Sequence, residues 1–291
     1  MYPNLFGIKD FSYTLCLIVG IALAFLIAIL FLKKKGTTKE GLIDLAVLLL
    51  SFLFIIASFL VFKRLYRVQS DGLFARIFTY SCIVIWLGVL LIDRFRNKLT
   101  FQRFLFYLFI LSVIVRVAYM LITPYNYRQH DTNYDEGHQG YAWIIYTTGQ
   151  LPTTNAGQYY HPPFNAAIQA GWMHFAEILY KIPNSILANA YDVSNSNVLY
   201  ESTQMLSCFY TTLISFLTFK TINKLELTKF AKIFAIVFIA FFPSLILFSA
   251  TENNDTLCLL FCFATLYFTF EYLRNKTWKN LIFIGLSIHE C

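Results

Sequence analysis

Charged residues are scarce in this chain, because Asp, Glu, Lys and Arg make up only 13% of its 291 residues. In soluble domains roughly a quarter of all residues are charged, and these residues cover the surface. Hydrophobic residues reach 58% and the mean hydropathy is +0.59. The composition therefore excludes an ordinary soluble domain and predicts a membrane protein.

Paired cysteine spacing is also missing, which argues against a zinc site and against a disulfide-rich secreted scaffold. Most of the six cysteines fall inside apolar stretches, where we interpret them as small buried hydrophobic residues. They are Cys16, Cys82, Cys208, Cys258, Cys262 and Cys291.

The sequence contains no Walker phosphate loop, no GxGxxG, no HExxH, no GxSxG and no visible internal repeat. The net charge of +7 comes from short basic clusters between apolar runs rather than from one basic face. We therefore interpret this charge as a topology signal and expect no nucleic-acid partner.

Apolar stretches of about 20 residues, the length that crosses a bilayer, occur seven times. They predict an all-α, polytopic transmembrane bundle. The stretches begin near Ser12, Leu42, Leu73, Phe104, Met205, Phe230 and Thr256. An eighth stretch, 280–288, is too short to cross, and we expect the chain to be truncated within it.

Lys and Arg concentrate on the cytoplasmic side of membrane proteins, and their clusters alternate here with the expected parity. The cytoplasmic clusters fall within 33–39, 94–103, 220–232 and 274–279. Lys63, Arg64 and Arg67 lie on the opposite side against this rule. The N-terminus and the long polar loop, 123–204, are therefore expected to be extracytoplasmic, in a bacterial cell membrane or a eukaryotic ER membrane.

Within that loop, segment 164–182 is apolar enough to resemble another span, but a crossing would invert the parity downstream. Pro162 and Pro163 favour a helix start just before it. Its polar residues recur at multiples of four positions and form a stripe: Asn165, Gln169, Glu177 and Lys181. We predict an amphipathic interfacial helix with a Glu177–Lys181 pair on its wet side.

The start of the loop, RQHDTNYDEGHQGY at 128–141, concentrates acidic and imidazole groups. Asp131, Asp135 and Glu136 are able to act as a general base, to bind a cation or to hold a protonated donor group. His130 and His138 add acid–base groups that titrate near neutral pH. The structural alternative is a solvated acidic loop that caps a helix.

Two shorter motifs accompany this cluster. In YYHPPF, the prolines form a stiff turn that places His161 at a defined height, or merely start a helix. In TENND, Glu252 and Asp255 face the same outer side between the last two complete spans. There the structural alternative is a tight turn in which Asp255 caps the following helix.

One basic residue, Arg116, lies inside the fourth span, about 9 Å from its outer end at 1.5 Å per residue. We favour snorkelling of its side chain toward water. The alternative is a functional arginine that binds the phosphate of a lipid carrier.

Together these motifs resemble the GT-C superfamily of membrane glycosyltransferases, especially its protein O-mannosyltransferase and aminoarabinose-transferase branch. The Asp135-Glu136-Gly137-His138 segment with Tyr141 resembles the acidic motif that starts the family's outer loop. His161-Pro162-Pro163 and Asp255 resemble its later elements. The resemblance covers roughly 101–288, and it leaves 1–100 as an accessory bundle of three spans before an incomplete transferase core, 101–291.

The resemblance implies inverting transfer of a sugar from a polyprenyl-phosphate donor to a protein, lipid or cell-envelope glycan at the outer face. Asp135 is the leading base and Asp131 its competitor, with Glu136 beside them. The implied substrate-binding residues are His138, Tyr141, His161, Glu252, Asp255 and Arg116. A divalent ion is compatible with these groups but not required by them.

Two other classes of function remain, a transporter and a non-catalytic scaffold. A transporter needs polar groups along the interiors of several spans, and we expect these spans to be nearly devoid of them. A non-catalytic membrane scaffold, derived from an enzyme, would keep the loop only for binding.

Overall fold

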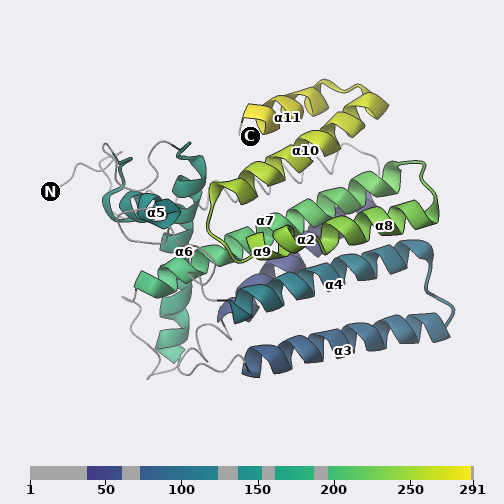
Figure 1. The fold of residues 1–291 in the computed structure, drawn as a ribbon, viewed down its shortest axis with the longest axis horizontal. Coiled ribbons are helices and arrows are strands. Elements are labelled where there is room, and N and C mark those ends of the chain that lie inside the picture. The colour runs from purple at the N-terminus through teal and green to yellow at the C-terminus, as the bar shows by residue number, and fades with distance from the viewer. Residues whose placement is uncertain (1–37, 61–72, 124–136, 153–160, 187–195, 290–291) are drawn as a thin grey trace. The chain divides into compact units, whose positions relative to one another are not determined.

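The computed structural model describes residues 38–60, 73–123, 137–152, 161–186 and 196–289 (Figure 1). Every regular element in these ranges is a helix, and they contain no strand. The expected all-α class is therefore confirmed for the described part of the chain.

The helices vary widely in length, and this variation separates complete spans from shorter elements. They are α2 Thr38–Ser58, α3 Leu73–Phe95, α4 Phe101–Ile122, α5 Gly137–Thr148, α6 Phe164–Ile186, α7 Ser196–Lys224, α8 Lys229–Ala240, α9 Pro243–Phe248, α10 Asn254–Asn275 and α11 Trp278–His289.

Four helices in the described ranges are long and apolar enough to cross a membrane, and they indicate a membrane protein. Their candidate spans are Ala75–Phe95, Phe101–Ile122, Leu199–Lys224 and Asn254–Asn275. Shorter apolar helices occupy Leu42–Ser58 and Trp278–Ile288, and the stretch near Ser12 lies outside the described residues.

The predicted span that begins near Phe230 is not continuous. α8 ends at Ala240, and α9 begins at Pro243 after a two-residue break. Proline lacks an amide hydrogen and disfavours helical conformation in the residue before it. The apolar composition of this stretch predicted one continuous span. In the structure Pro243 begins a separate helix, so the stretch is divided in two.

The chain forms two compact units, which are described separately. The first unit contains α2, α5, α6 and the first turns of α7 up to Leu206. The second contains α3, α4, α7 from Ser207 onward, and α8 to α11. The predicted boundary near residue 100 stays a prediction.

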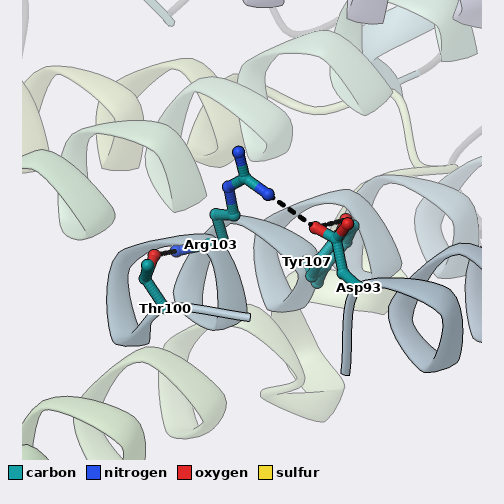
Figure 2. Close-up of polar contacts among 4 residues, drawn as sticks. All are labelled: Asp93, Thr100, Arg103 and Tyr107. Carbon is teal, nitrogen blue, oxygen red and sulfur yellow. Dashed lines mark hydrogen bonds and ion pairs between the residues drawn. The ribbon is translucent and has the colours of Figure 1, made fainter. Parts of the chain in front are cut away.

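In the second unit, α3 and α4 form a helical hairpin that Asp93 holds closed. Its carboxylate accepts hydrogen bonds from Arg103 Nη1 at 3.0 Å and from the Tyr107 hydroxyl at 2.9 Å (Figure 2). Thr100 caps α4 by accepting from the Arg103 amide. The turn passes through Asn97 with φ of 52°, a conformation that asparagine tolerates better than most residues.

α4 also packs against α8 and α9, so that it lies between α3 and α8 in Figure 1. The core between α4, α7 and α8 is formed by Leu105, Leu108, Ile222 and Ile236, and each of these side chains is buried. Burial of such aliphatic side chains contributes about 1.5–3 kcal/mol each. Arg116 lies on the same helix, α4, and is also buried.

α7 contradicts the expectation that the spans would be nearly devoid of polar groups. Its buried face carries a row of hydroxyl groups, at Ser202, Thr203, Ser207, Thr211, Ser215 and Thr218. Most of them donate to carbonyls three or four residues earlier in the same helix. Serine and threonine are able to enter an apolar helix in this way because the helix itself accepts their protons.

In the first unit, α5 packs against α6, and aromatic residues connect them to the neighbouring helices. The indole of Trp172 on α6 donates to the Ser202 carbonyl of α7 at 2.8 Å. Its ring also lies 5.8 Å from the ring of Phe52 on α2. A tryptophan that is buried and hydrogen-bonded at once fixes α6 against both neighbours.

The predicted wet stripe of α6 is wrong at its first two positions, because Asn165 and Gln169 are 4% and 3% exposed. Glu177 is half-buried and accepts a hydrogen bond from Tyr146. The expected partner Lys181 has a side chain outside the described set. A period of four places residues on one face of a helix, but it does not decide whether that face meets water or protein.

The cysteine interpretation holds in part. Cys208 is buried, whereas Cys262 is exposed on α10, and the four described cysteines are free thiols.

Candidate functional site

Two of the predicted site histidines lie together in the first unit. His138 stands in the first turn of α5, and His161 directly precedes α6. Their ring centroids are 5.3 Å apart, with the planes inclined by 40°. Both side chains are half-buried. The two loop motifs, which are separate in the sequence, therefore contribute side chains to one place.

Gly137 and Gly149 bracket the helix that carries His138. Gly137 has φ of 91° and Gly149 has φ of 68°, a region in which other L-residues are strained. The Gly149 amide donates to the Ile145 carbonyl at 2.8 Å and terminates α5. The glycine of the DEGH motif, Gly137, is thus explained by its positive φ, a backbone conformation that positions His138 at the start of α5.

The two prolines after His161 start α6 as predicted. The Pro163 carbonyl accepts a hydrogen bond from the Ala167 amide at 2.8 Å, which closes the first helical turn. Proline fits this position because its fixed φ is already helical and the first turn needs no amide donor there. His161 is consequently held next to a stiff segment.

Asp131, Asp135 and Glu136 lie outside the described residues, so their roles stay predictions. Chain connectivity still limits their distance from the histidines. The Cα of Asp135 is at most about 11 Å from that of His138, and the Cα of Asp131 at most about 25 Å, at 3.6 Å per residue. Connectivity thus allows both carboxylates to reach the histidine pair, and the upper bound is smaller for Asp135.

Tyr141 follows His138 by three positions and lies on the same side of α5. It is 4% exposed, and burial raises the pKa of its phenol. The hydroxyl therefore keeps its proton at neutral pH and is a hydrogen-bond donor in this region.

A second polar group joins α5 to α6, and of its members only Glu177 was expected to form a polar pair, with Lys181. The Tyr146 hydroxyl donates to Glu177 Oε2 at 3.2 Å, and the Tyr146 ring lies 4.4 Å from the ring of His174. Trp143 extends the cluster toward Tyr200 on α7, at a centroid distance of 5.0 Å. The spacing of His174 and Glu177, three apart on one helix face, was the available signal.

Burial, the negative charge of Glu177 and the hydrogen bond to Glu177 raise the pKa of Tyr146 to about 12. Tyr146→Phe is expected to lower the free energy of unfolding by about 1 kcal/mol at neutral pH, because Glu177 loses a donor. Between pH 10 and 12, the unfolded phenol of the wild type ionises first, so wild-type stability falls. The difference between the two proteins should shrink over that interval.

Unfolding in detergent, followed by circular dichroism from pH 7 to about 12, measures this difference. Tyr80→Phe removes an exposed phenol from α3 and should leave the stability at neutral pH unchanged. A stability difference that stays constant up to the highest pH would contradict the assignment.

Glu252 and Asp255 belong to the second unit, at the connection between α9 and α10. Glu252 is 1% exposed, whereas Asp255 is exposed in the first turn of α10. The structural alternative, in which Asp255 caps this helix, is wrong, because the Asn253 side chain accepts from the Thr256 amide at 3.2 Å. Convergence of these acids with the histidines stays a prediction.

Arg116 does not snorkel, because its side chain is 0% exposed. Its Nη1 donates to the Ser112 carbonyl at 3.1 Å and to the Ala240 carbonyl at 2.8 Å. The guanidinium is turned toward the end of α8 rather than along the span toward water. The alternative, a functional buried arginine, is developed below.

No three His, Cys, Asp or Glu side chains group as a metal site within the ranges that the structure describes. The imidazoles of His138 and His161 would suit a divalent transition metal, with further ligands from the acidic segment just before Gly137. The metal requirement therefore stays open.

A scan against protein-family models and searches of curated proteins and of solved structures found no match for this chain. The functional conclusion therefore depends on its own residues.

Proposed function

We propose that this protein is an inverting membrane glycosyltransferase. It moves a sugar from a polyprenyl-phosphate donor to a protein, lipid or cell-envelope acceptor on the extracytoplasmic face. The expected location is a bacterial cell membrane, or the ER membrane in a eukaryote. The four apolar helices support the bilayer as the environment from which such a donor arrives.

The observation that carries the proposal is the pairing of His138 with His161. Each comes from one of the two loop motifs that resemble the transferase family, and the acidic segment with Asp135 is tied covalently to the first. Connectivity allows the Asp135 carboxylate to reach these imidazoles, and Tyr141 on the same helix as His138 adds a phenol. Such a set is suited to proton transfer and hydroxyl recognition.

In the proposed reaction, Asp135 or Asp131 takes the proton of the acceptor hydroxyl. The acceptor oxygen attacks the anomeric carbon as the bond from this carbon to the phosphate oxygen breaks. That oxygen keeps the bonding electrons, so polyprenyl phosphate leaves and the anomeric configuration inverts. His138, His161 and Tyr141 would orient the acceptor and sugar, with Glu136 beside them.

The resemblance implies three further substrate-binding residues. Glu252 and Asp255 are candidates for hydrogen bonds to sugar hydroxyls, and Arg116 is the candidate for the phosphate. A cation that stabilises the leaving phosphate lowers the barrier, because negative charge grows there as the bond breaks.

The alternatives are a non-catalytic scaffold and, less favoured, a transporter. The polar face of α7 would favour transport if its hydroxyls lined a pathway. Most of those hydroxyls instead donate to carbonyls of their own helix. A scaffold would bind lipid-linked sugars without releasing the carrier, so carrier release separates it from an enzyme.

The test is release of polyprenyl phosphate from a panel of polyprenyl-phosphate sugars, in vesicles that contain the purified chain and a membrane extract as acceptor source. Mass spectrometry would measure the free carrier. The proposal expects release above that of protein-free vesicles for at least one donor. Release at the protein-free level for every donor would overturn the proposal.

A further inference from the structure

The break between α8 and α9 leaves backbone carbonyls at the end of a helix inside an apolar stretch. α8 has 12 residues and is about 18 Å long, less than the roughly 30 Å of hydrocarbon in a bilayer. Carbonyls in the last turn of a helix lack the usual amide partners and need other donors. At Ala240 the donor is Arg116.

Arg116 uses only one side of its guanidinium for this purpose. Nη1 donates to both carbonyls, of Ser112 and Ala240. Nε and Nη2 are buried and have no hydrogen-bond partner in the described part of the chain. These two nitrogens form one edge of the planar group, and their N–H bonds make a fork that matches two oxygens of a phosphate.

The charge of this guanidinium is also uncompensated among the described residues. Its side-chain hydrogen bonds go to two backbone carbonyls, and it forms no ion pair with a carboxylate of the described residues. An arginine removed from water without a counter-ion is costly, and carbonyl dipoles offset only part of that cost. An anion bound at the unused edge would supply both the missing acceptors and the missing charge.

We propose that the Nε–Nη2 edge of Arg116, at the break between α8 and α9, binds a phosphate-type oxyanion. The ligand is a phosphate group, from a lipid or free in solution, held about 9 Å along α4 from its end at Ile122. As the place for the carrier phosphate, this site rests on the proposed function. The fork itself recognises the phosphate whether or not a sugar is attached.

Binding of sugar-free probes tests the site without any transfer reaction. The probes are geranylgeranyl monophosphate, the matched alcohol geranylgeraniol and inorganic phosphate, added to the full chain in a maltoside detergent that contains no phosphate. Titration calorimetry would measure affinity. The wild type is expected to bind the monophosphate at least about ten-fold more tightly than the alcohol.

Arg116→Lys is the informative variant, because lysine keeps the positive charge and a donor for Ala240 but has no planar fork. It should lose the preference for the monophosphate. Arg103→Lys is the matched control on the same helix, at an exposed position beside Asp93, and should keep it (Figure 2). Binding of inorganic phosphate alone would support the site and identify a free-phosphate source.

Equal binding of monophosphate and alcohol by the wild type, together with no binding of inorganic phosphate, would overturn the inference, and this comparison needs no variant to fold. A preference retained by Arg116→Lys, or lost equally by Arg103→Lys, would also overturn it. Carrier release with no preference for the monophosphate would leave the transferase standing without this site. A preference that depends on Arg116, without carrier release, would leave the site and remove the transferase.

Discussion

Asp135→Asn is expected to lower the rate of carrier release by about 10²–10⁴-fold, the range that general-base catalysis contributes. Asparagine has nearly the same shape but cannot accept the proton of the acceptor hydroxyl. The resemblance ranks Asp135 first, and its covalent proximity to His138 agrees with that ranking. Asp131 is the competing candidate for the base. Only one of the two substitutions, Asp135→Asn or Asp131→Asn, should therefore abolish proton transfer.

The measurement compares initial rates of carrier release for both variants under saturating donor. Glu226→Gln is the matched control, because it neutralises an exposed carboxylate in the connection between α7 and α8. Its rate should equal that of the wild type. Wild-type rates in both aspartate variants would contradict the mechanism.

Lys224→Met is expected to destabilise the second unit by about 3–5 kcal/mol, the usual cost of removing one partner of a buried ion pair. Lys224 Nζ forms an ion pair with Glu271 and donates to the Tyr267 hydroxyl at 3.1 Å. The Glu271 side chain is only 3% exposed, so its carboxylate would lose the cation beside it at a position with little access to water. The pair connects the end of α7 to α10.

Unfolding of the purified chain in mixed micelles would measure this loss. The double variant Lys224→Met/Glu271→Leu is the control, because it removes both charges and should recover most of the stability. A double variant no more stable than Lys224→Met would show that packing, and not the loss of the counter-charge, causes the effect.

Several local features could be predicted because they depend on neighbouring residues alone. The start of α6 at Phe164 follows from the two prolines before it, and the helix is observed there. The span on α4 follows from its predominantly apolar composition. The pairing of His138 with His161 could be anticipated only through the family resemblance, since nothing local relates the two motifs.

Other features could not be predicted because they depend on which surface each helix buries. The amides of Asn165 and Gln169 show the same period whether they face water or protein. Arg116 could snorkel in an isolated helix, but here a carbonyl from the end of α8 lies within hydrogen-bond distance. Likewise, the composition of Asn253-Asn254-Asp255 allowed more than one residue to cap α10. In the structure the N-cap residue is Asn253.

The sequence by itself determined that this chain is helical and suited to a membrane. Its apolar stretches are long and its charged residues are few, so the chain is better solvated by a bilayer than by water. It also determined where the polar chemistry is concentrated, in the loop motifs around His138 and His161. The tertiary structure alone decided that these histidines meet, that α8 stops short and that Arg116 turns one edge of its guanidinium to that break. Those outcomes depend on contacts between distant segments, which no local pattern of residues encodes.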